Sequence, residues 1–222
     1  LIVEDNIDIL QYLSDELGKN YRILKAQNGK EAMSIIKEQE VDLVLTDIMM
    51  PIMNGIQLCK LIKQNLRTCH ILVIILSAKT DFKEQLEGLQ VGADDYIPKP
   101  FSLVMITTKI RNLFRTRHRA IEYYSKSLEI EPEKIALNPL DEDLLKKAVE
   151  IMEKHMDDAE FTTDEFAREM CMSRSNLHLK MKALTGESTN EFIRKVRFNY
   201  ACKLLKDGKY TVSEISSMVG YV

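Results

Sequence analysis

The order of apolar and polar positions divides the chain into two parts with different periodicities. In the first part, short apolar runs rich in Ile, Leu and Val alternate with helix-length amphipathic segments. Such runs are typical of strands buried on both faces. Five successive strand–helix units predict an α/β fold, with a five-stranded, parallel, doubly wound sheet between two layers of helices. The predicted strands are residues 1–3, 21–25, 41–46, 71–76 and 96–97, and the predicted helices are residues 6–17, 29–39, 55–65, 81–89 and 101–115.

From residue 141 onward the strand-like runs stop and only helical spacing remains. Three of the expected helices begin with a capping box, in which a Ser or Thr stands three residues before a Glu. An all-α domain is therefore expected over residues 141–222. Its predicted helices are residues 144–155, 164–170, 174–184, 189–206 and 212–219, and the capping boxes pair Thr162 with Glu165, Ser188 with Glu191, and Thr211 with Glu214.

Residues 116–140 connect the two patterns as a helical extension and linker. Apolar residues at positions 110, 114, 121, 124 and 128 follow coiled-coil spacing, which predicts that the last helix of residues 1–115 continues toward residue 130. A single amphipathic helix lying on its own domain would show the same spacing, and the pattern does not separate the two. Pro132 and Pro139 then interrupt the helix and indicate a linker.

Polar side chains stand directly after four of the predicted strands. Glu4 and Asp5 follow the first run, Asp47 the third, Ser77 the fourth and Lys99 the fifth. The carboxyl ends of parallel strands meet at one edge of an open sheet, where the ligand sites of such sheets lie. Three carboxylates, a hydroxyl and an ammonium gathered there are suited to bind a divalent cation and to let Asp47 accept a phosphoryl group.

Composition and charge narrow the possible partners. The chain of 222 residues has no apolar stretch near the ~18 residues of a membrane span and no signal peptide, so no membrane contact is expected. Its four Cys lack paired spacing, which favours free thiols. The net charge is −3, but residues 170–210 hold nine Lys and Arg against three Asp and Glu, so a polyanion is expected to bind there. A first strand of three residues indicates that the chain is part of something longer.

The polar sites have the spacing of a known family. Asp47 opens the segment Asp-Ile-Met-Met-Pro-Ile-Met-Asn-Gly, Ser77 lies 30 positions later, and residues 94–101 read Asp-Asp-Tyr-Ile-Pro-Lys-Pro-Phe. This order resembles the flavodoxin-like receiver domain of two-component response regulators over residues 1–115. The resemblance implies that Asp47 is the phosphoacceptor, and that Mg²⁺ binds Glu4, Asp5, Asp47 and the backbone carbonyl of Met49.

The same resemblance implies how the site signals. Ser77 and Lys99 would contact the phosphoryl oxygens, and the Lys99–Pro100 peptide bond would be cis. Ser77 would turn toward the phosphoryl group while Tyr96 moves into the space that it leaves, which would alter the surface of the fourth helix, fifth strand and fifth helix.

Several of these residues also have a purely structural interpretation. Asp5 is expected equally as a helix N-cap, and Tyr96 as a core residue with a solvated hydroxyl. Met49, Met50 and Met53 are expected to be packing and loop residues, since thioethers suit soft metals. The joint occurrence of five sites in order favours the functional interpretation.

An internal repeat at an offset of 49 residues characterises the second part. Residues 161–167 align with residues 210–216, and Met170 aligns with Val219. A short helix, a turn at Cys171 and a second helix opening with Ser-Arg-Ser-Asn are typical of a helix-turn-helix. Two such units joined by one long helix resemble the AraC-type DNA-binding domain. The second copy stops at Val222, so this domain is expected to be truncated and to bind DNA weakly and with strong salt dependence.

The AraC-type resemblance implies which residues face DNA. Leu179 stands where that family usually has Arg. The remaining candidates for bases or phosphates are Ser173, Arg174, Ser175, Asn176, His178 and Lys182.

Together these features predict a phosphorylation-controlled transcription regulator rather than an enzyme. A sensor histidine kinase, separate or in the same chain, would phosphorylate Asp47, and homodimers would bind promoter DNA in the cytoplasm. The pairing of the two domains also resembles the C-terminal part of single-chain hybrid two-component sensors, whose anchor would lie in a membrane. One alternative is a receiver that regulates a protein partner without DNA. Another is a Mg²⁺-dependent aspartyl-phosphate phosphatase, which would need an acid where Met49 stands.

Overall fold

The computed structural model describes residues 1–78 and 91–221. These residues form two compact units, Leu1–Thr116 and Arg117–Val222. The helix predicted over residues 81–89 lies outside the described residues. Among the helices that are described, none combines the length and the apolar character needed to cross a membrane.

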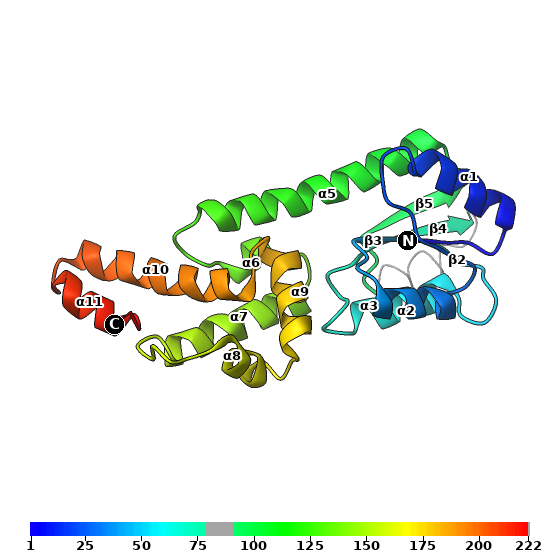
Figure 1. The fold of residues 1–222 in the computed structure, drawn as a ribbon. Coiled ribbons are helices and arrows are strands. Elements are labelled where there is room, and N and C mark those ends of the chain that lie inside the picture. Colours follow the sequence, from blue (N-terminus) through cyan, green and yellow to red (C-terminus); the bar gives the residue numbers. More distant parts are fainter. Residues whose placement is uncertain (79–90, 222) are drawn as a thin grey trace. The chain divides into compact units, whose positions relative to one another are not determined.

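The first unit contains the predicted parallel sheet. Its five strands are hydrogen-bonded in the order β2-β1-β3-β4-β5, and every neighbouring pair is parallel (Figure 1). β1 lies between β2 and β3, so the direction in which successive strands are added reverses after β2, as it does in doubly wound sheets. The predicted fold class is therefore confirmed. The strands are β1 (Ile2–Val3), β2 (Lys25–Ala26), β3 (Leu43–Asp47), β4 (Leu72–Ala78) and β5 (Asp95–Lys99).

Two helical layers bury the two faces of this sheet. The described helices of the unit are α1 (Ile7–Leu17), α2 (Gly29–Glu38), α3 (Gly55–Lys63) and the first part of α5 (Leu103–Lys126). Figure 1 shows α1 and α5 on one face and α2 and α3 on the other. Because each strand alternates its side chains between the faces, two separate apolar clusters result, one with α1 and α5 and one with α2 and α3.

The second strand differs from its prediction. The sequence pattern predicts it over residues 21–25, but the ladder pairs only Lys25 and Ala26 with β1. Tyr21 instead stacks on Phe114, with ring centroids 6.1 Å apart, and packs into the cluster beneath α5. Burial of the aromatic ring against that helix outweighs its strand propensity, as tertiary context commonly does at a sheet edge.

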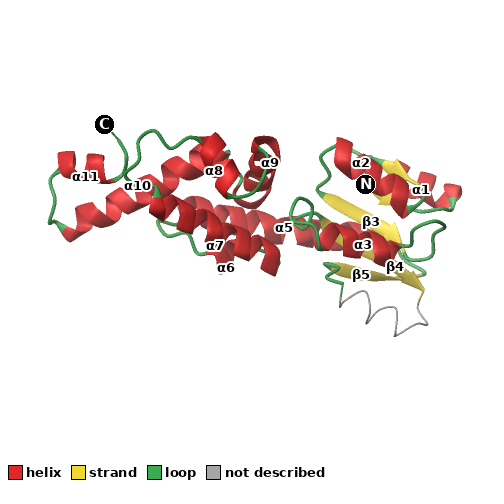
Figure 2. Ribbon diagram, turned by 90° about the horizontal axis from the view of Figure 1, so that it is seen from below, coloured by secondary structure: helices red, strands yellow, loops and turns green. Residues whose placement is uncertain are grey.

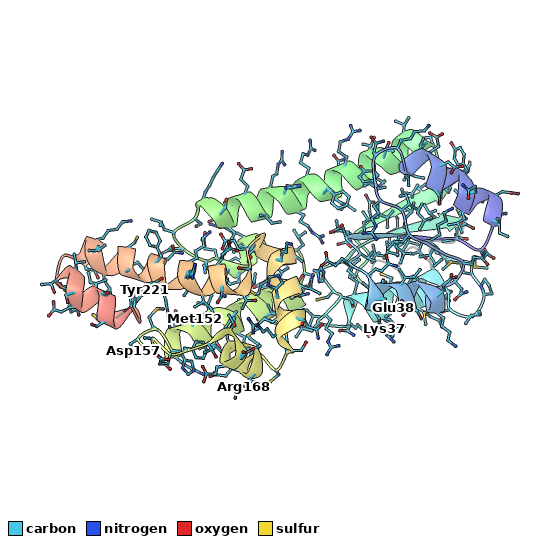
Figure 3. The ribbon with its side chains drawn as sticks, in the orientation of Figure 1. Lys37, Glu38, Met152, Asp157, Arg168 and Tyr221 are labelled. Carbon is cyan, nitrogen blue, oxygen red and sulfur yellow. The ribbon has the colours of Figure 1, made fainter. Side chains whose placement is uncertain are left out.

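The second unit is all-α, as predicted. Its core lies between α7, α8, α9 and α10, and includes Phe166, Phe192 and Met152, which Figure 3 labels on α7. Figures 1 and 2 show α11 at the end of α10 that is distant from α9, where Leu204, Ile215 and Val219 form a separate small cluster. The helices are α6 (Pro132–Ile135), α7 (Pro139–Lys154), α8 (Thr163–Glu169), α9 (Arg174–Thr185), α10 (Thr189–Asp207) and α11 (Val212–Met218).

The region between the two sequence patterns is helical for most of its length. α5 continues to Lys126, and the boundary between the two units falls within it. Pro132 and Pro139 each occupy the first turn of a helix, where the missing N–H has no intrahelical partner to lose. Tyr124 and Ile135 are buried in the core of the second unit, so residues 117–140 contribute to that core.

Candidate functional site

The strand register brings the polar residues of the first unit to one edge of the sheet. Val3 pairs with Thr46, so Glu4 follows β1 at the level of Asp47 on β3. Asp47 pairs with Leu76, which precedes Ser77 on β4, and Ser77 pairs with Pro98, which precedes Lys99 on β5. All of these polar side chains therefore stand at the carboxyl ends of their strands, where a ligand of an open parallel sheet binds.

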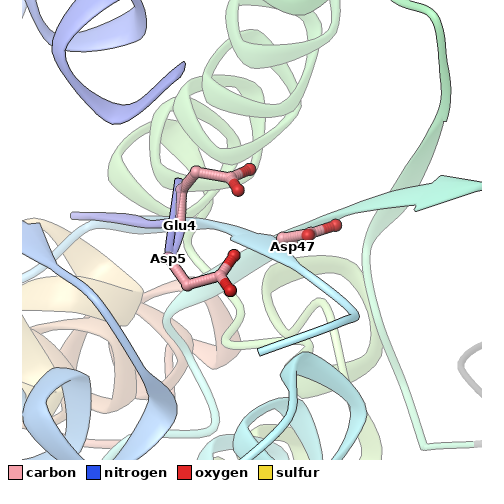
Figure 4. A group of neighbouring side chains, drawn as sticks. All are labelled: Glu4, Asp5 and Asp47. Carbon is pink, nitrogen blue, oxygen red and sulfur yellow. The ribbon is translucent and has the colours of Figure 1, made fainter. Parts of the chain in front are cut away.

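Three carboxylates share this edge. One oxygen each from Glu4, Asp5 and Asp47 lies within 4.8 Å of the other two, and Figure 4 shows the three side chains directed into the same space. Glu4 is 1% exposed and Asp47 6% exposed, whereas Asp5 is open to solvent. The set joins two buried acids to one accessible acid.

Lys99 lies between the two buried acids. Its Nζ is 3.0 Å from Oδ1 of Asp47 and 3.3 Å from Oε2 of Glu4. The backbone N–H of Ile48 also donates to Oδ1 of Asp47, at 2.9 Å. Both donors lie at the same oxygen, Oδ1 of Asp47. The Lys99–Pro100 peptide bond is cis, as predicted.

The crowding of charge perturbs two of these groups. Burial, and then the charge of Asp47, raise the pKa of Glu4 against the opposing effect of Lys99. Burial by itself would lower the pKa of Lys99, but the hydrogen bond and charge of Asp47, together with Glu4, outweigh it and raise that pKa. Three carboxylates face one ammonium, which leaves an excess of two negative charges, and oxygen ligands of this kind suit Mg²⁺.

The start of α3 packs directly against the backbone of Asp47. A Cβ atom at Gly55 would overlap the Asp47 carbonyl oxygen, and the Gly55 N–H donates to the Ile48 carbonyl oxygen at 3.0 Å. Thr46 Oγ1 donates to the same Asp47 carbonyl oxygen at 2.9 Å. Residue spacing alone did not indicate these two positioning roles, because both depend on how closely α3 approaches the end of β3.

The other predicted residues of the first unit occupy the surroundings of Asp47. Ser77 is fully buried, and its Oγ has no hydrogen-bond partner among the described residues. Tyr96 is half-buried and packs against the apolar cluster of α2 and α3. Met49 is 67% exposed, while Met50 is buried and Met53 packs against the same cluster, which agrees with their predicted packing and loop roles.

The second unit contains the predicted helix-turn-helix geometry. The capping box of Thr162 and Glu165 begins α8, and Ser173 caps α9 through a 3.3 Å hydrogen bond from the Asn176 N–H. Leu177 is buried on the inner face of α9. We call α9 the recognition helix, after the element that enters the major groove in this motif. Its N-cap and exposed residues are Ser173, Arg174, Ser175, His178 and Lys182, and Asn176 is half-buried beside them.

The internal repeat extends to the hydrogen bonds of the turn. Cys171 has a φ of 57°, and Gly220, 49 positions later, has a φ of 70°. The Met172 N–H donates to the Ala167 carbonyl at 3.0 Å, and at the same offset the Tyr221 N–H donates to the Ser216 carbonyl at 2.9 Å. The two copies therefore leave their first helix through the same left-handed turn.

Comparison with known protein families agrees with both geometries. A family model described as "response regulator receiver domain" matches residues 1–111, half of the chain. The chain belongs to the response regulator receiver family. A second model, described as "helix-turn-helix domain", matches residues 166–222. The predicted pairing of a receiver domain with an AraC-type helix-turn-helix domain is confirmed.

Similar proteins carry this receiver domain in different settings. "Histidine kinase P4" of Formosa agariphila is 37% identical over 221 residues, which are 100% of this chain and 16% of that protein. "Response regulator ArlR" of Staphylococcus saprophyticus is 37% identical over 116 residues, 52% of this chain and 51% of that protein. The chain thus spans between 16% and 51% of the length of these relatives.

Among solved structures, the receiver domain of Francisella response regulator 1452 is 35% identical and covers 51% of this chain and 93% of that chain, with a TM-score of 0.47. The receiver domain of a signal transduction histidine kinase from Syntrophus aciditrophicus is 32% identical and covers 50% of this chain and 86% of that chain, with a TM-score of 0.49.

The basic stretch of residues 170–210 presents less charge to solvent than its sequence suggests. Three of its nine cations, Lys180, Lys195 and Arg197, turn inward. Lys180 is 1% exposed and pairs with Asp141, and the buried Arg197 guanidinium donates to the Asp158 carbonyl oxygen. These residues hold helices together instead of meeting phosphates, a role that a count of charges does not reveal.

Proposed function

We propose that this response regulator is controlled by phosphorylation of Asp47, with a histidine kinase as the phosphoryl donor, and that it binds promoter DNA through its second unit. One observation carries the proposal: oxygens of three acids lie within 4.8 Å of one another, with the Lys99 ammonium 3.0 Å from Asp47. Acceptor, metal ligands and a charge-neutralising cation are thus gathered at one point.

The donor set fits Mg²⁺. In this proposal the ion is held by Glu4, Asp5, Asp47 and the backbone carbonyl of Met49, as hard oxygen ligands suit it. The bound ion neutralises charge on the carboxylates and on the incoming phosphoryl oxygens. Asp5 would be the solvent-exposed ligand of this set.

The chain's own residues position the transfer. A carboxylate oxygen of Asp47 attacks the phosphorus of a phosphohistidine. The P–O bond forms as the P–N bond breaks, and the imidazole nitrogen leaves with the electron pair of that bond. Lys99 and Ser77 then contact the phosphoryl oxygens, while the Ile48 N–H keeps the acceptor carboxylate in place. In this proposal the receiver promotes only its own phosphorylation and dephosphorylation and is not an enzyme toward other substrates.

The output is a change in association and DNA binding. Ser77 turns toward the phosphoryl group and Tyr96 moves into the vacated space, which favours a homodimer. Paired second units then bind promoter DNA through the exposed side of the recognition helix. The candidate contact residues are Ser173, Arg174, Ser175, Asn176, His178 and Lys182.

Phosphoryl incorporation tests the acceptor. Incubation with a radiolabelled acyl phosphate and Mg²⁺ is expected to give acid-stable, base-labile labelling of the wild type and none of Asp47→Asn. Asp42→Asn, an exposed acid just before the same strand, is the matched control and should label normally. Equal labelling of Asp47→Asn would move the acceptor elsewhere.

Thermal stability tests the ion. Mg²⁺ in 100-fold excess over its dissociation constant should stabilise the folded protein by ~2.7 kcal/mol, because it binds the native state alone. Asp5→Asn should reduce this gain at equal Mg²⁺ concentration, whereas Asp8→Asn, an exposed acid in the first turn of α1, should keep it. A full Mg²⁺ effect in Asp5→Asn would remove that carboxylate from the ligand set.

A salt titration separates this function from a receiver that acts only on a protein partner. Binding of duplex DNA should weaken steeply as salt rises, since each phosphate contact releases a counterion. A chain that contacts no DNA would show no such slope.

A further inference from the structure

The last turns of α5 are built into the second unit. Ile106 and Ile110, near the start of this helix, are buried in the receiver core. Tyr124, near its end, is 1% exposed in the core around the recognition helix. One uninterrupted helix therefore supplies core residues to both units.

Tyr124 makes specific polar contacts at the junction between α9 and α10. Its hydroxyl donates to Oε2 of Glu187 at 2.9 Å. Glu187 lies between Gly186, the C-cap of α9, and Ser188, the N-cap of α10. The hydrogen bond thus joins α5 to the point where the recognition helix ends.

Lys195 of α10 completes this contact from the other side. Its Nζ lies 3.8 Å from the centroid of the Tyr124 ring and donates to the Tyr124 carbonyl oxygen at 2.7 Å and to that of Ser125 at 3.3 Å. The same ammonium is 3.5 Å from Oε1 of Glu187. A cation at the last carbonyls of α5 satisfies groups that a helix end leaves without partners.

The end of α5 also packs tightly against the end of the recognition helix. Gly186 ends α9 with a φ of 77°, and a Cβ atom there would lie 2.9 Å from Cγ2 of Ile121. Burial and the adjacent Glu187 raise the pKa of Tyr124, so its hydroxyl keeps its proton and remains a donor. A displacement of the end of α5 must carry the α9–α10 junction with it or leave a buried hydroxyl without its acceptor, which is costly.

We propose that Tyr124, Glu187 and Lys195 form a coupling contact through which the receiver state, carried by α5, sets the position of the recognition helix. The three are positioning residues: they touch no DNA and act through α9. This inference rests on the proposed phosphorylation control of DNA binding. It adds the residues by which control reaches the DNA-binding unit and requires a two-state change in α5 that both units sense.

The adjacent tyrosine provides a matched control. The hydroxyl of Tyr123 hydrogen-bonds Glu131, just before α6, and Lys134 donates to it at 3.1 Å. Tyr123→Phe therefore removes a hydroxyl from the same turn of α5 without touching the α9–α10 junction. Tyr124→Phe removes the Glu187 bond but keeps the ring that fills the core and faces Lys195.

The test uses beryllofluoride with Mg²⁺ as a mimic of the phosphoryl group on Asp47. It measures how much this mimic changes the affinity of the full chain for DNA. The probe is a fluorescent duplex that the wild type has selected from random sequences. We expect wild type and Tyr123→Phe to gain about fivefold or more in affinity, within the usual range of allosteric coupling. Tyr124→Phe should gain less than about twofold, whatever its basal affinity. A purely structural role would lower the melting temperature and leave the gain unchanged, which would overturn the inference.

Two further variants keep the test decisive if Tyr124→Phe unfolds. Glu187→Gln retains an acceptor for the Tyr124 hydroxyl and should retain more of the gain than Glu187→Ala. Equal, full gains in both variants would overturn the coupling contact. A wild type without any gain would instead overturn phosphorylation control of DNA binding, and this inference with it.

Discussion

Lys180 and Asp141 form a fully buried ion pair inside the second unit, with Nζ 2.5 Å from Oδ1 and both side chains 1% exposed. Asp141 also accepts a 2.6 Å hydrogen bond from the Asn138 amide at the start of α7. The pair joins the middle of the recognition helix to α7 on the side away from the exposed candidates. Lys180 therefore orients the helix and is not part of the surface that DNA would meet.

Substitution of Lys180 should separate stability from DNA binding. Lys180→Met leaves Asp141 buried without its cation and should lower the free energy of unfolding by about 3–5 kcal/mol. The salt slope of DNA binding should not change. Lys182→Met, two positions away and exposed, should reduce that slope by ~1 with little effect on stability. Urea denaturation and salt titration of both variants make the comparison.

A paired substitution is the control for the buried charge. Lys180→Met combined with Asp141→Leu replaces both partners by apolar groups and should recover most of the lost stability. If Lys180→Met by itself lowered the salt slope as much as Lys182→Met, Lys180 would be reaching phosphates and the interpretation would be wrong.

Arg174 should determine base preference rather than stability. Its ion pair with Asp164 is 3.4 Å long and exposed, so Arg174→Ala should change the free energy of unfolding by less than ~0.5 kcal/mol. If the guanidinium contacts a base edge, the variant should lose ~1–3 kcal/mol of discrimination between sequences. Competition binding with a panel of duplexes measures this. A uniform loss over all duplexes would assign Arg174 to a phosphate.

The raised pKa of Glu4 predicts that its negative charge lowers the free energy of unfolding at neutral pH. The folded protein holds this proton more tightly than the unfolded chain, so Glu4 contributes stability at low pH that is lost as the pH rises through its folded-state pKa. Glu4→Gln should therefore raise the free energy of unfolding at pH 7 by ~0.5–2 kcal/mol without Mg²⁺. Below the unfolded-state pKa of ~4.3 the two proteins should be equally stable.

Denaturation at the two pH values, with Glu38→Gln as an exposed control at the end of α2, measures the effect. A Glu4→Gln variant that is less stable than the wild type at pH 7 would contradict the conclusion that the Glu4 charge destabilises the fold.

Lys99 should be needed for the response to phosphorylation but not for the ion. Lys99→Ala removes a cation from beside Glu4 and Asp47, so Mg²⁺ binding should be kept or strengthened. Beryllofluoride should then no longer alter self-association, because no ammonium engages the phosphoryl mimic. Light scattering with and without the mimic reports this, with Lys60→Ala on the exposed face of α3 as control. An unchanged response in Lys99→Ala would contradict the proposed switch.

The elements that could be predicted from sequence are those whose signals are local. The capping boxes at Thr162, Ser188 and Thr211 all form, because the three residues from N-cap to N3 suffice to make them. Strand runs rich in β-branched residues indicated the parallel sheet, and in such a sheet the strand ends must converge. That is why Asp47 and Lys99, 52 positions apart in the chain, could be expected to lie together.

Other features depended on what each residue meets in three dimensions. Tyr21 lies outside the second strand, and its ring stacks on Phe114. Gly55 has no room for a Cβ atom, because α3 starts against the Asp47 carbonyl. Lys180 is one of the nine cations counted in residues 170–210, but it is buried against Asp141 and does not face solvent. Tyr124 fitted a coiled-coil seam in sequence, but in the fold its ring and hydroxyl are occupied by Lys195 and Glu187.

By itself, the sequence determined the parallel sheet, the repeated helix-turn-helix and the identity of the chemical groups at the strand ends, since periodicity and capping act over a few neighbouring residues. The tertiary structure decided which charges are buried in pairs and which face solvent, and it alone placed the end of α5 in the core of the second unit. Burial and electrostatic pairing depend on residues distant in the chain, so no local pattern encodes them.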